Sequence, residues 1–488
     1  MCLYVGIVVL HFHRFWVFDF MNKKIVAILA VLWMCATTSS LRGEFETIAG
    51  WDEQVFPSYL ISTAAMKHTT EVDETTLGDA LGAFGVVVTA TEDDQPIKVS
   101  ILCDGFAETS EFVGVLPKKG QAYRVFPKMR YKFEKLSQYR QATPSSVTFR
   151  VQLGEDVPEE KTVTITMRSI NDCAFTLIDG DNTIDMNFCF AAYVNEQHPF
   201  VDKLLREALD IGVIDSFNGY QSDDPNQVIA QVYAIWDLMA NRDVRYSSIT
   251  ATAALSRNTH SQHVRLLEET INNTQANCVD GTVLFASVLR KIGIDSALVV
   301  TKDHCYLAFW AGKNHEKLYG LETTMMCADT SEEEIPDFYD AAVAEEQRWD
   351  YSWGSFVLAM ATGTTNLQKE LDKKEAEISI IDVATARLNG VLPIPFHSDQ
   401  EFLAYDFTYS EDEVAEEAGE AMEETEYGEE TEEMVAADEG SAATTEEWNT
   451  EETEAIASEQ ESVEWDEEET PKKRRRAPKQ PAANVEWE

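Results

Sequence analysis

The chain has 488 residues, of which 44% are hydrophobic and 10% aromatic. It is therefore long enough to bury a sizeable core in about two to four domains. Its formal net charge is -47, and residues 411–470 carry 27 acidic residues without a Lys or an Arg. The rest of the chain is moderately acidic, which argues against nucleic-acid binding, because phosphate recognition requires a basic face.

Residues 1–40 have the composition of a leader. From Met21, two lysines precede an apolar run of about a dozen residues and then small residues, the pattern of a secretory signal peptide. The run is short for a membrane span, so no stable transmembrane span is predicted after leader removal, and the chain is predicted to be exported to the periplasm, the cell surface or the medium. Met21 is favoured as the true start over a double hydrophobic leader. Lipidation at Cys35 is the less favoured alternative, because bulky residues precede it.

Six of the eight cysteines lie beyond the leader. Export permits disulfides, but the sequence cannot choose among their pairings. None of the six belongs to a Cys-x-x-Cys pair, and the chain has neither a Gly-rich phosphate loop nor a His-Glu-x-x-His motif. We therefore predict no cofactor and no metal site.

Residues 45–195 are predicted to form a β-rich domain. Short segments rich in β-branched residues are bounded there by Gly, Pro or Asp, and their regular turns favour a β-sandwich-like fold. The predicted strands are residues 84–92, 97–105, 112–117, 146–154, 161–169 and 174–180.

Residues 196–332 are predicted to form a second domain. Apolar residues recur at three- and four-residue spacing in residues 200–213 and 225–244, which indicates two helices. Asp224 and Pro225 provide an N-cap and a first turn for the second helix. After a third helix that begins near Asn277, the predicted strands are Ser296–Val300, His304–Trp310 and Lys317–Thr324.

The C-terminal part of the chain divides into two predicted segments. Residues 333–405 are predicted to be a helical extension whose last helix stops at Gly390. Residues 406–488 are rich in Glu, Ala and Thr and hold too few apolar residues to offset the entropy of ordering, so we predict a disordered acidic tail. A solvated spacer is favoured over a partner-binding motif.

Cys278 lies where the third helix is predicted to begin. Asn277 is a favourable N-cap, and Asp280 can reach back towards a free amide. The unpaired N–H groups and the dipole of a helix N-terminus stabilise an anion, which suits a reactive thiolate. Such a nucleophile also needs a base and a group that orients the base. His304 opens one predicted strand and Glu322 lies near the end of the next, so antiparallel pairing of these strands would bring the two side chains together.

The stretch from Gln275 to Thr324 resembles the transglutaminase-like superfamily, which shares a papain-like cysteine core, and suggests an exported bacterial member. The family pattern of Cys-x-Asp, Arg-x-x-Gly-Ile, His before an apolar strand and a closing Asp-x-Thr is matched by Cys278, Asp280, Arg290, Gly293, Ile294, His304 and Glu322 to Thr324, with Glu in place of the usual Asp. The resemblance implies an antiparallel sheet packed on the Cys helix. It also implies that Cys278 attacks an amide carbonyl to give a thioester, with His304 as base and Glu322 as its orienter.

The sequence thus predicts an α+β chain with an N-terminal β-sandwich-like domain, a transglutaminase-like domain and an acidic tail. Gln275 and the Cys278 backbone N–H are the candidate oxyanion donors. Two functions stay open: a secreted cysteine enzyme that hydrolyses or transfers peptide or protein amides, and an inactive transglutaminase-like binding or scaffold protein of the cell envelope. The substrate and the oligomeric state are not predicted.

Overall fold

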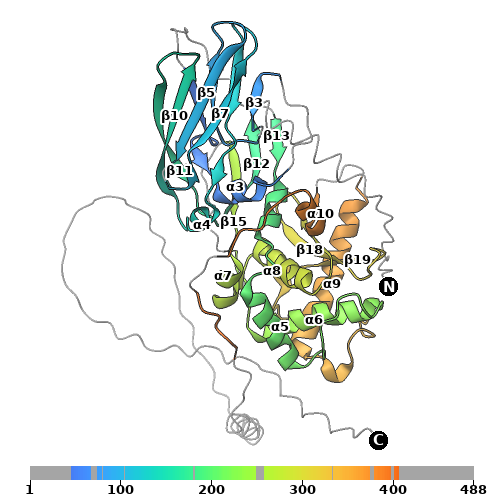
Figure 1. The fold of residues 1–488 in the computed structure, drawn as a ribbon. Coiled ribbons are helices and arrows are strands. Elements are labelled where there is room, and N and C mark those ends of the chain that lie inside the picture. Colours follow the sequence, from blue (N-terminus) through green and yellow to red (C-terminus); the bar gives the residue numbers. More distant parts are fainter. Residues whose placement is uncertain are drawn as a thin grey trace, which may run out of the picture. The chain divides into compact units, whose positions relative to one another are not determined.

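The computed structural model describes residues 45–66, 74–79, 81–103, 105–179, 182–248, 258–331, 333–373, 378–396 and 400–405. Contacts divide the chain into two units, Met1–Tyr405 and Asp406–Glu488, and every described residue lies in the first unit. The predicted leader (1–40) and acidic tail (406–488) lie outside the described residues. The described part combines helices with several sheets, which confirms the α+β class (Figure 1).

Two sheets make up most of the N-terminal part. Their strands are Glu46–Ala49 (β1), Gln54–Val55 (β2), Thr76–Gly78 (β3), Phe84–Thr89 (β4), Gln95–Cys103 (β5), Ser110–Leu116 (β7), Ala122–Phe126 (β8), Thr143–Leu153 (β10) and Glu159–Met167 (β11). The strand orders are β1-β4-β8-β3 and β2-β11-β10-β5-β7. Alternate residues of β10, such as Val147 and Phe149, are fully buried, as expected where strand side chains alternate between two faces. The two sheets contact each other through β1 and β11, β4 and β5, and β7 and β8, so their buried faces share one core.

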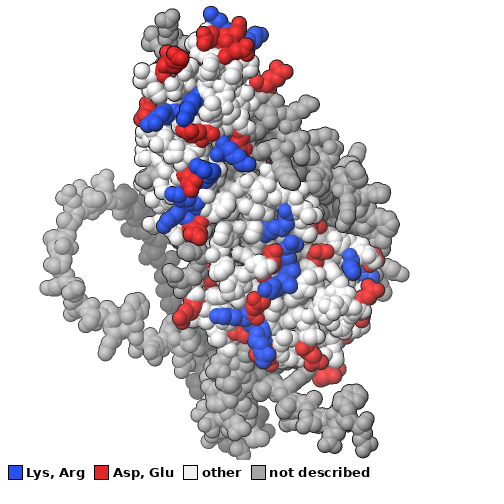
Figure 2. Space-filling model, in the orientation of Figure 1, with Lys and Arg blue, Asp and Glu red and all other residues white. Residues whose placement is uncertain are grey.

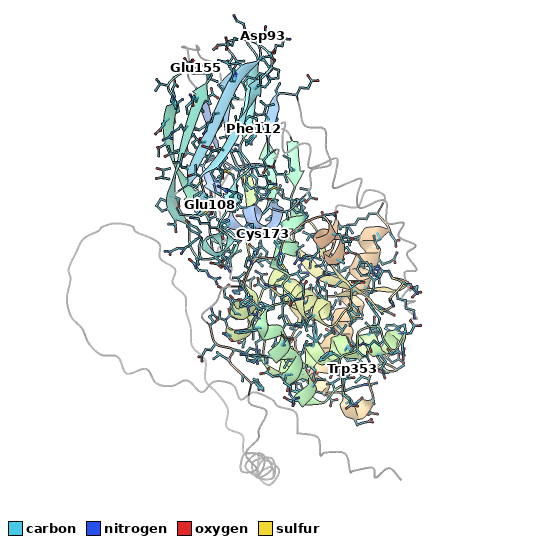
Figure 3. The ribbon with its side chains drawn as sticks, viewed as in Figure 1. Asp93, Glu108, Phe112, Glu155, Cys173 and Trp353 are labelled. Carbon is cyan, nitrogen blue, oxygen red and sulfur yellow. The ribbon has the colours of Figure 1, made fainter. Side chains whose placement is uncertain are left out.

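A third sheet joins the two regions that the sequence separated. Strand β12 (Asp172–Asp179) pairs with β13 (Asn182–Asp185) and with β15 (Thr259–His263), both antiparallel. Cys173, which is labelled in Figure 3, lies on β12 and is fully buried. The predicted strands of residues 45–195 are all present, but β15 belongs to the predicted second domain. The boundary at residue 195 therefore crosses a sheet, because this pairing joins residues about 90 positions apart, which local periodicity does not reveal.

The second region is built on the sheet β19-β18-β17-β20. Its elements are Pro199–Ile211 (α5), Pro225–Asn241 (α6), Arg245–Tyr246 (β14), Leu267–Asn272 (α7), Gln275–Ala276 (β16), Cys278–Lys291 (α8), Ser296–Val300 (β17), Cys305–Trp310 (β18), Leu318–Leu321 (β19), Asp350–Leu371 (α9) and Ser379–Asp382 (β20). All neighbouring strands of this sheet are antiparallel. Helix α8 packs on β17 and β18, and α9 packs on β18 and β19. The three helices predicted between residues 200 and 291 are confirmed.

The helical extension predicted over residues 333–405 is helical at Asp350–Leu371, but the prediction is wrong at residues 379–382. Ser379–Asp382 forms β20, which pairs with β17 through Leu298↔Ile381 and Val299↔Ile380. The open edge of β17 offers unpaired backbone groups, and two adjacent isoleucines favour the extended backbone that satisfies them. Asp382 then caps the short helix α10 (Val383–Leu388) by accepting a hydrogen bond from Thr385 N. This segment is thus part of the sheet that supports α8.

Two glycines bring β19 and α9 into close backbone contact. A Cβ atom built on Gly320 would lie 2.2 Å from the carbonyl carbon of Gly363, and one on Gly363 would lie 2.6 Å from the carbonyl carbon of Gly320. No larger residue fits at either position without moving the backbone. Just beyond this contact, Glu322 N donates to Ala359 O over 3.0 Å. The end of β19 is therefore fixed directly against α9.

Candidate active site

Cys278 is the first residue of α8, as the sequence predicts. Asn277 is the N-cap, and its Oδ1 accepts hydrogen bonds from the amides of Val279 and Asp280, each over 2.9 Å. Asp280 Oδ2 accepts in turn from Asn277 N over 2.9 Å, which completes a capping box. Among the hydrogen bonds of the described residues, none uses the Cys278 amide. The first turn thus leaves this N–H beside the thiol.

His304 and Glu322 meet at one end of the β18–β19 pair. His304 immediately precedes β18, and Glu322 follows β19, which pairs with β18 through Leu307↔Leu321. His304 Nε2 lies 2.7 Å from Glu322 Oε2. The predicted approach of the two side chains is confirmed, and it follows from the short hairpin register.

Cys278 is the second side chain that acts on His304. A hydrogen bond with Cys278, followed by the one with Glu322, raises the pKa of His304 to about 10. Because Nε2 is occupied by Glu322, Nδ1 is the nitrogen available to Cys278. The structure therefore brings Cys278, His304 and Glu322 into one continuous polar contact, with the imidazolium as the favoured form at neutral pH.

Glu322 is held by more than the imidazole. Its Oε1 accepts from the Thr324 hydroxyl over 2.6 Å and from Thr324 N over 3.2 Å. Burial raises the pKa of this carboxyl group, but the hydrogen bonds from His304 and Thr324 outweigh burial and the net pKa is lowered. Both carboxylate oxygens are thus engaged, and the side chain is set in one direction. The longer arm of Glu is accommodated without a free oxygen.

The side chains of the site differ in exposure. Cys278 is partly exposed, and the His304 side chain is 34% exposed, whereas Glu322 is buried. Cys305, next to His304, is also buried, which raises the pKa of its thiol. Within the described part of the chain, none of the six cysteines forms a disulfide. A reagent can therefore reach Cys278 more readily than the buried thiols.

Gln275, the predicted side-chain oxyanion donor, lies in β16 and is exposed. Among the described contacts, no hydrogen bond links its side chain to Cys278, His304 or Glu322. Its placement follows from β16, which pairs in parallel with β14 through Arg245↔Gln275. The structure leaves the Cys278 amide as the better placed of the two predicted donors.

Tyr246 is a residue of the site that the sequence analysis missed. It lies on β14, opposite Ala276, and β14 also packs on the turn Thr323–Met325 (η2) that follows Glu322. Burial, and then the charges of Cys278 and Glu322, raise the pKa of its phenol, although the residue is 46% exposed. No motif marks this position, and only the pairing of β14 with β16 brings it to the thiol.

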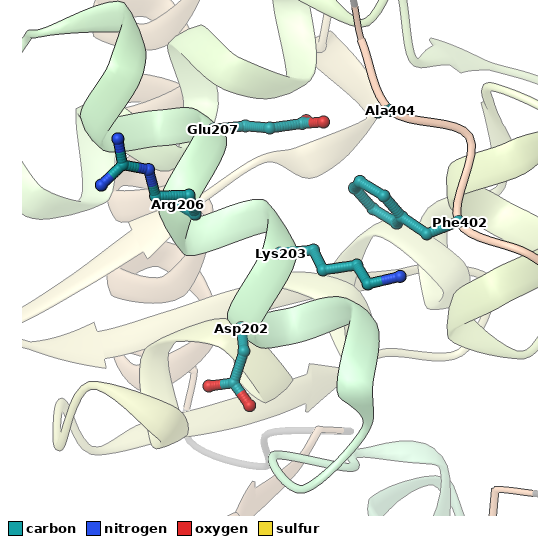
Figure 4. Close-up of a pocket in the computed structure, with 6 residues that line it drawn as sticks. All are labelled: Asp202, Lys203, Arg206, Glu207, Phe402 and Ala404. Carbon is teal, nitrogen blue, oxygen red and sulfur yellow. The ribbon is translucent and has the colours of Figure 1, made fainter.

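A separate hollow of about 460 Å³ lies between α5 and the segment 400–405 (Figure 4). It is lined by Asp202, Lys203, Arg206, Glu207, Phe402 and Ala404. Glu207 Oε1 accepts a hydrogen bond from Tyr405 N, and Lys203 Nζ lies 5.1 Å from the centre of the Phe402 ring. These contacts attach the segment to the helix, and none of the lining residues belongs to the Cys278 group.

Two further properties hold for the described part of the chain. No group of three or more His, Cys, Asp or Glu side chains there is arranged to hold a metal ion. None of its helices is both long enough and apolar enough to cross a membrane.

In comparisons with known proteins, no family model matches the chain, and no curated protein matches it at a significant level.

Proposed function

We propose that the chain is an exported cysteine enzyme of the transglutaminase-like type that acts on peptide or protein amides. The observation that carries the proposal is the placement of His304 between Cys278 and Glu322, with a 2.7 Å contact to the carboxylate. In this proposal α8 and its antiparallel sheet form the transglutaminase-like domain, and the two N-terminal sheets form a β-sandwich-like domain attached to it.

The proposed reaction begins with the Cys278 thiolate attacking the carbonyl carbon of the amide. The negative charge that develops on the carbonyl oxygen is stabilised by the Cys278 N–H, which no other described group uses. The C–N bond then breaks, and His304 transfers its proton to the leaving amine, which gives a thioester on Cys278. Water or a second amine attacks the thioester while His304 takes up its proton, and the thiolate is released with a carboxylic acid or a new amide.

Glu322 has an orienting role in this scheme. Because its Oε2 contacts His304 Nε2, the imidazole keeps Nδ1 directed at the thiol throughout the cycle. The buried carboxylate also stabilises the imidazolium that pairs with the thiolate. Thr324 fixes the second oxygen, so the carboxylate does not rotate away when the proton moves.

Partial exposure of the thiol favours the enzyme over a purely structural role. Four of the other cysteines, Cys173, Cys189, Cys305 and Cys327, are buried. A cysteine that only fills space beneath a helix cap would be expected to be buried in the same way and to have no ion pair beside it. The inactive scaffold is the outcome expected if Cys278 proves unreactive.

Alkylation of the folded protein by iodoacetamide, with peptide mapping of the six cysteines, tests the proposal. We expect Cys278 to react at least about 100-fold faster than the buried thiols near pH 6, since only a thiolate attacks the reagent. His304→Ala should remove most of this advantage. If Cys278 reacts only after the protein unfolds, it is a packing residue and the scaffold function is supported instead.

A further inference from the structure

Asp280, two residues after the thiol, is fully buried and accepts three hydrogen bonds. Its Oδ2 accepts from Asn277 N over 2.9 Å and from the Arg265 guanidinium over 2.7 Å, and its Oδ1 accepts from Arg265 N over 2.7 Å. A buried carboxylate is costly unless a charged partner and hydrogen bonds compensate it. Arg265, itself 14% exposed, supplies that compensation at the start of the Cys278 helix.

The same segment attaches the helix start to a sheet. Asn277 Nδ2 donates to His263 O over 3.3 Å, and Val264 N donates to Asn171 O over 2.7 Å. His263 is the last residue of β15, which pairs with β12. The first turn of α8 is therefore joined to the sheet β13-β12-β15 through residues 263–265.

We propose that Arg265 is a positioning residue that acts through Asp280 to fix the Cys278 sulfur and N–H relative to His304. This inference rests on the proposed function, because the position of Cys278 has consequences only if the thiol reacts. It also makes the sheet β13-β12-β15 a support of the site rather than part of an independent N-terminal domain.

The charge state of Asp280 follows from its surroundings. Burial raises its pKa, and the hydrogen bonds from Asn277 and Arg265 oppose that rise. The other charged groups on the elements around α8 have partners of their own. On α7, α8, α6 and the end of β19 these are Glu268 with His198 and Arg140, Glu269 with Arg140 and Asn171, Arg290 with Glu196, Lys291 with Asp202, Asp237 with Ser352, and Glu322 with His304. On α5 they are Glu207 with Arg242, Arg206 with Asp210, and Lys203 with the Phe402 ring. Tyr246, Cys305 and Tyr306 also lie near the thiol or on β18, and burial raises the pKa of each.

Removal of the guanidinium therefore has a specific pH signature. Without Arg265, the pKa of Asp280 rises further and the protonated form extends towards neutral pH. Protonated Asp280 is a weaker acceptor for Asn277 N, so the first turn of α8 loosens on the acid side. Ionised Asp280 retains this bond, which restores the turn as the pH increases.

The test is the alkylation rate of Cys278 by iodoacetamide in the full chain, from about pH 5 to about pH 9. We expect Arg265→Met to slow the reaction between about tenfold and 100-fold, the scale expected for a small misplacement of a reacting group. It should also add an acid-side step where Asp280 protonates. Asp280→Asn, which cannot ionise, should be slow without that step, and Arg265→Lys should recover most of the rate.

Arg290→Met is the matched control, because the Arg290–Glu196 pair lies at the opposite end of the same helix with an N–O distance of 2.9 Å. Its alkylation rate should equal that of the wild type. Thermal unfolding checks that each variant is folded, and Arg265→Lys and Asp280→Asn carry the test if Arg265→Met does not fold. A wild-type rate and pH profile in folded Arg265→Met, or in Asp280→Asn if Arg265→Met does not fold, overturns the inference. An unreactive Cys278 in the wild type overturns the proposed function instead.

Discussion

The start of α8 and the outer face of the five-stranded sheet both carry ion pairs, but in different surroundings. The pair between Arg265 and Asp280 has side chains that are 14% and 0% exposed. The pair between Arg150 and Glu160 joins β10 to β11 with side chains that are 46% and 49% exposed. Figure 2 shows basic and acidic side chains interspersed over the surface where Figure 1 places β11, β10 and β5.

The difference lies in what each kind of pair can fix. An exposed pair is hydrated in both the paired and unpaired states, so it contributes little free energy and tolerates movement. A buried pair must keep its geometry, because separation leaves an uncompensated charge. Beside Cys278 the Arg265–Asp280 pair is buried and the His304–Glu322 pair is half-buried, so both pairs hold side chains of the candidate site in a defined geometry.

Glu322→Gln should have the largest effect, because it changes the charge beside His304 with little change in volume. The amide can donate to Nε2, which favours a neutral imidazole with its proton on Nδ1 and removes the imidazolium that pairs with the thiolate. We expect Cys278 alkylation near pH 6, or turnover once a substrate is known, to fall by about 100-fold or more. The measurement is the alkylation rate with peptide mapping.

Glu322→Asp is the control for this variant. It retains the charge but shortens the arm, so it should keep more of the rate than the Gln variant does. A Gln variant as fast as the wild type would show that Glu322 does not act on the thiol through His304.

Gly363→Ala tests the support behind Glu322. In an ordinary helical position, replacing glycine by alanine stabilises the helix by about 0.5–1 kcal/mol, because alanine loses less conformational entropy on folding. Here the new Cβ meets backbone atoms of Gly320 and Leu321 at 2.6–2.9 Å, which cannot rotate away. We therefore expect the clash to dominate and to lower the free energy of unfolding by about 1–3 kcal/mol. Denaturant unfolding measures this, and the alkylation rate should fall as Glu322 shifts.

Thr365→Ala is the matched control on the exposed side of the same helix. It should leave both the stability and the alkylation rate close to those of the wild type. Equal stabilities of the Gly363 and Thr365 variants would mean that β19 and α9 can separate at no cost.

The centre of the candidate site could be predicted from sequence because local rules specify it. Asn277 and Asp280 are three residues apart, so the cap and the position of Cys278 follow from helix geometry alone. His304 and Glu322 flank two consecutive strands, and strands that follow each other in sequence usually pair as neighbours, which brings these two ends together. These elements require no knowledge of the rest of the chain.

The missed features all depend on partners that are distant in sequence. The local sequence of β20 predicts a helix, because it does not reveal the pairing with the edge of β17. The segment of β15 is assigned to the second predicted domain, because the local sequence does not reveal its pairing with β12. Tyr246 lies near Cys278 only because β14 pairs with β16. Arg265 precedes Asp280 by 15 residues, and no periodicity relates a loop cation to a helical carboxylate. Such pairings are set by tertiary packing, which a single sequence does not encode locally.

The pH dependence of stability should show a smaller effect of the same site. The pKa of His304 is about 10 in the folded protein and near 6.5 for a free histidine. Since the folded value is the higher one, the pair stabilises the protein fully below the unfolded pKa and loses this contribution as the pH rises through about 10. The stability difference between the wild type and His304→Ala should therefore shrink between neutral pH and about pH 10.5. Denaturant unfolding at several pH values measures it, and a difference that grows over this range would contradict the assignment.

Arg150→Ala should have the smallest effect, because it removes an exposed ion pair of the five-stranded sheet rather than the buried pair at the start of α8. Its Nε lies 2.6 Å from Glu160 Oε1, a shorter contact than the 2.7 Å between Arg265 and Asp280. Distance alone would rank the surface pair first, but exposure reverses the order, because water replaces the lost partner. We expect the free energy of unfolding to change by about 0.2–1 kcal/mol and Cys278 alkylation to stay at the wild-type rate. If Arg150→Ala slowed the alkylation of Cys278 as much as Arg265→Met does, the outer face of the five-stranded sheet would also support the site.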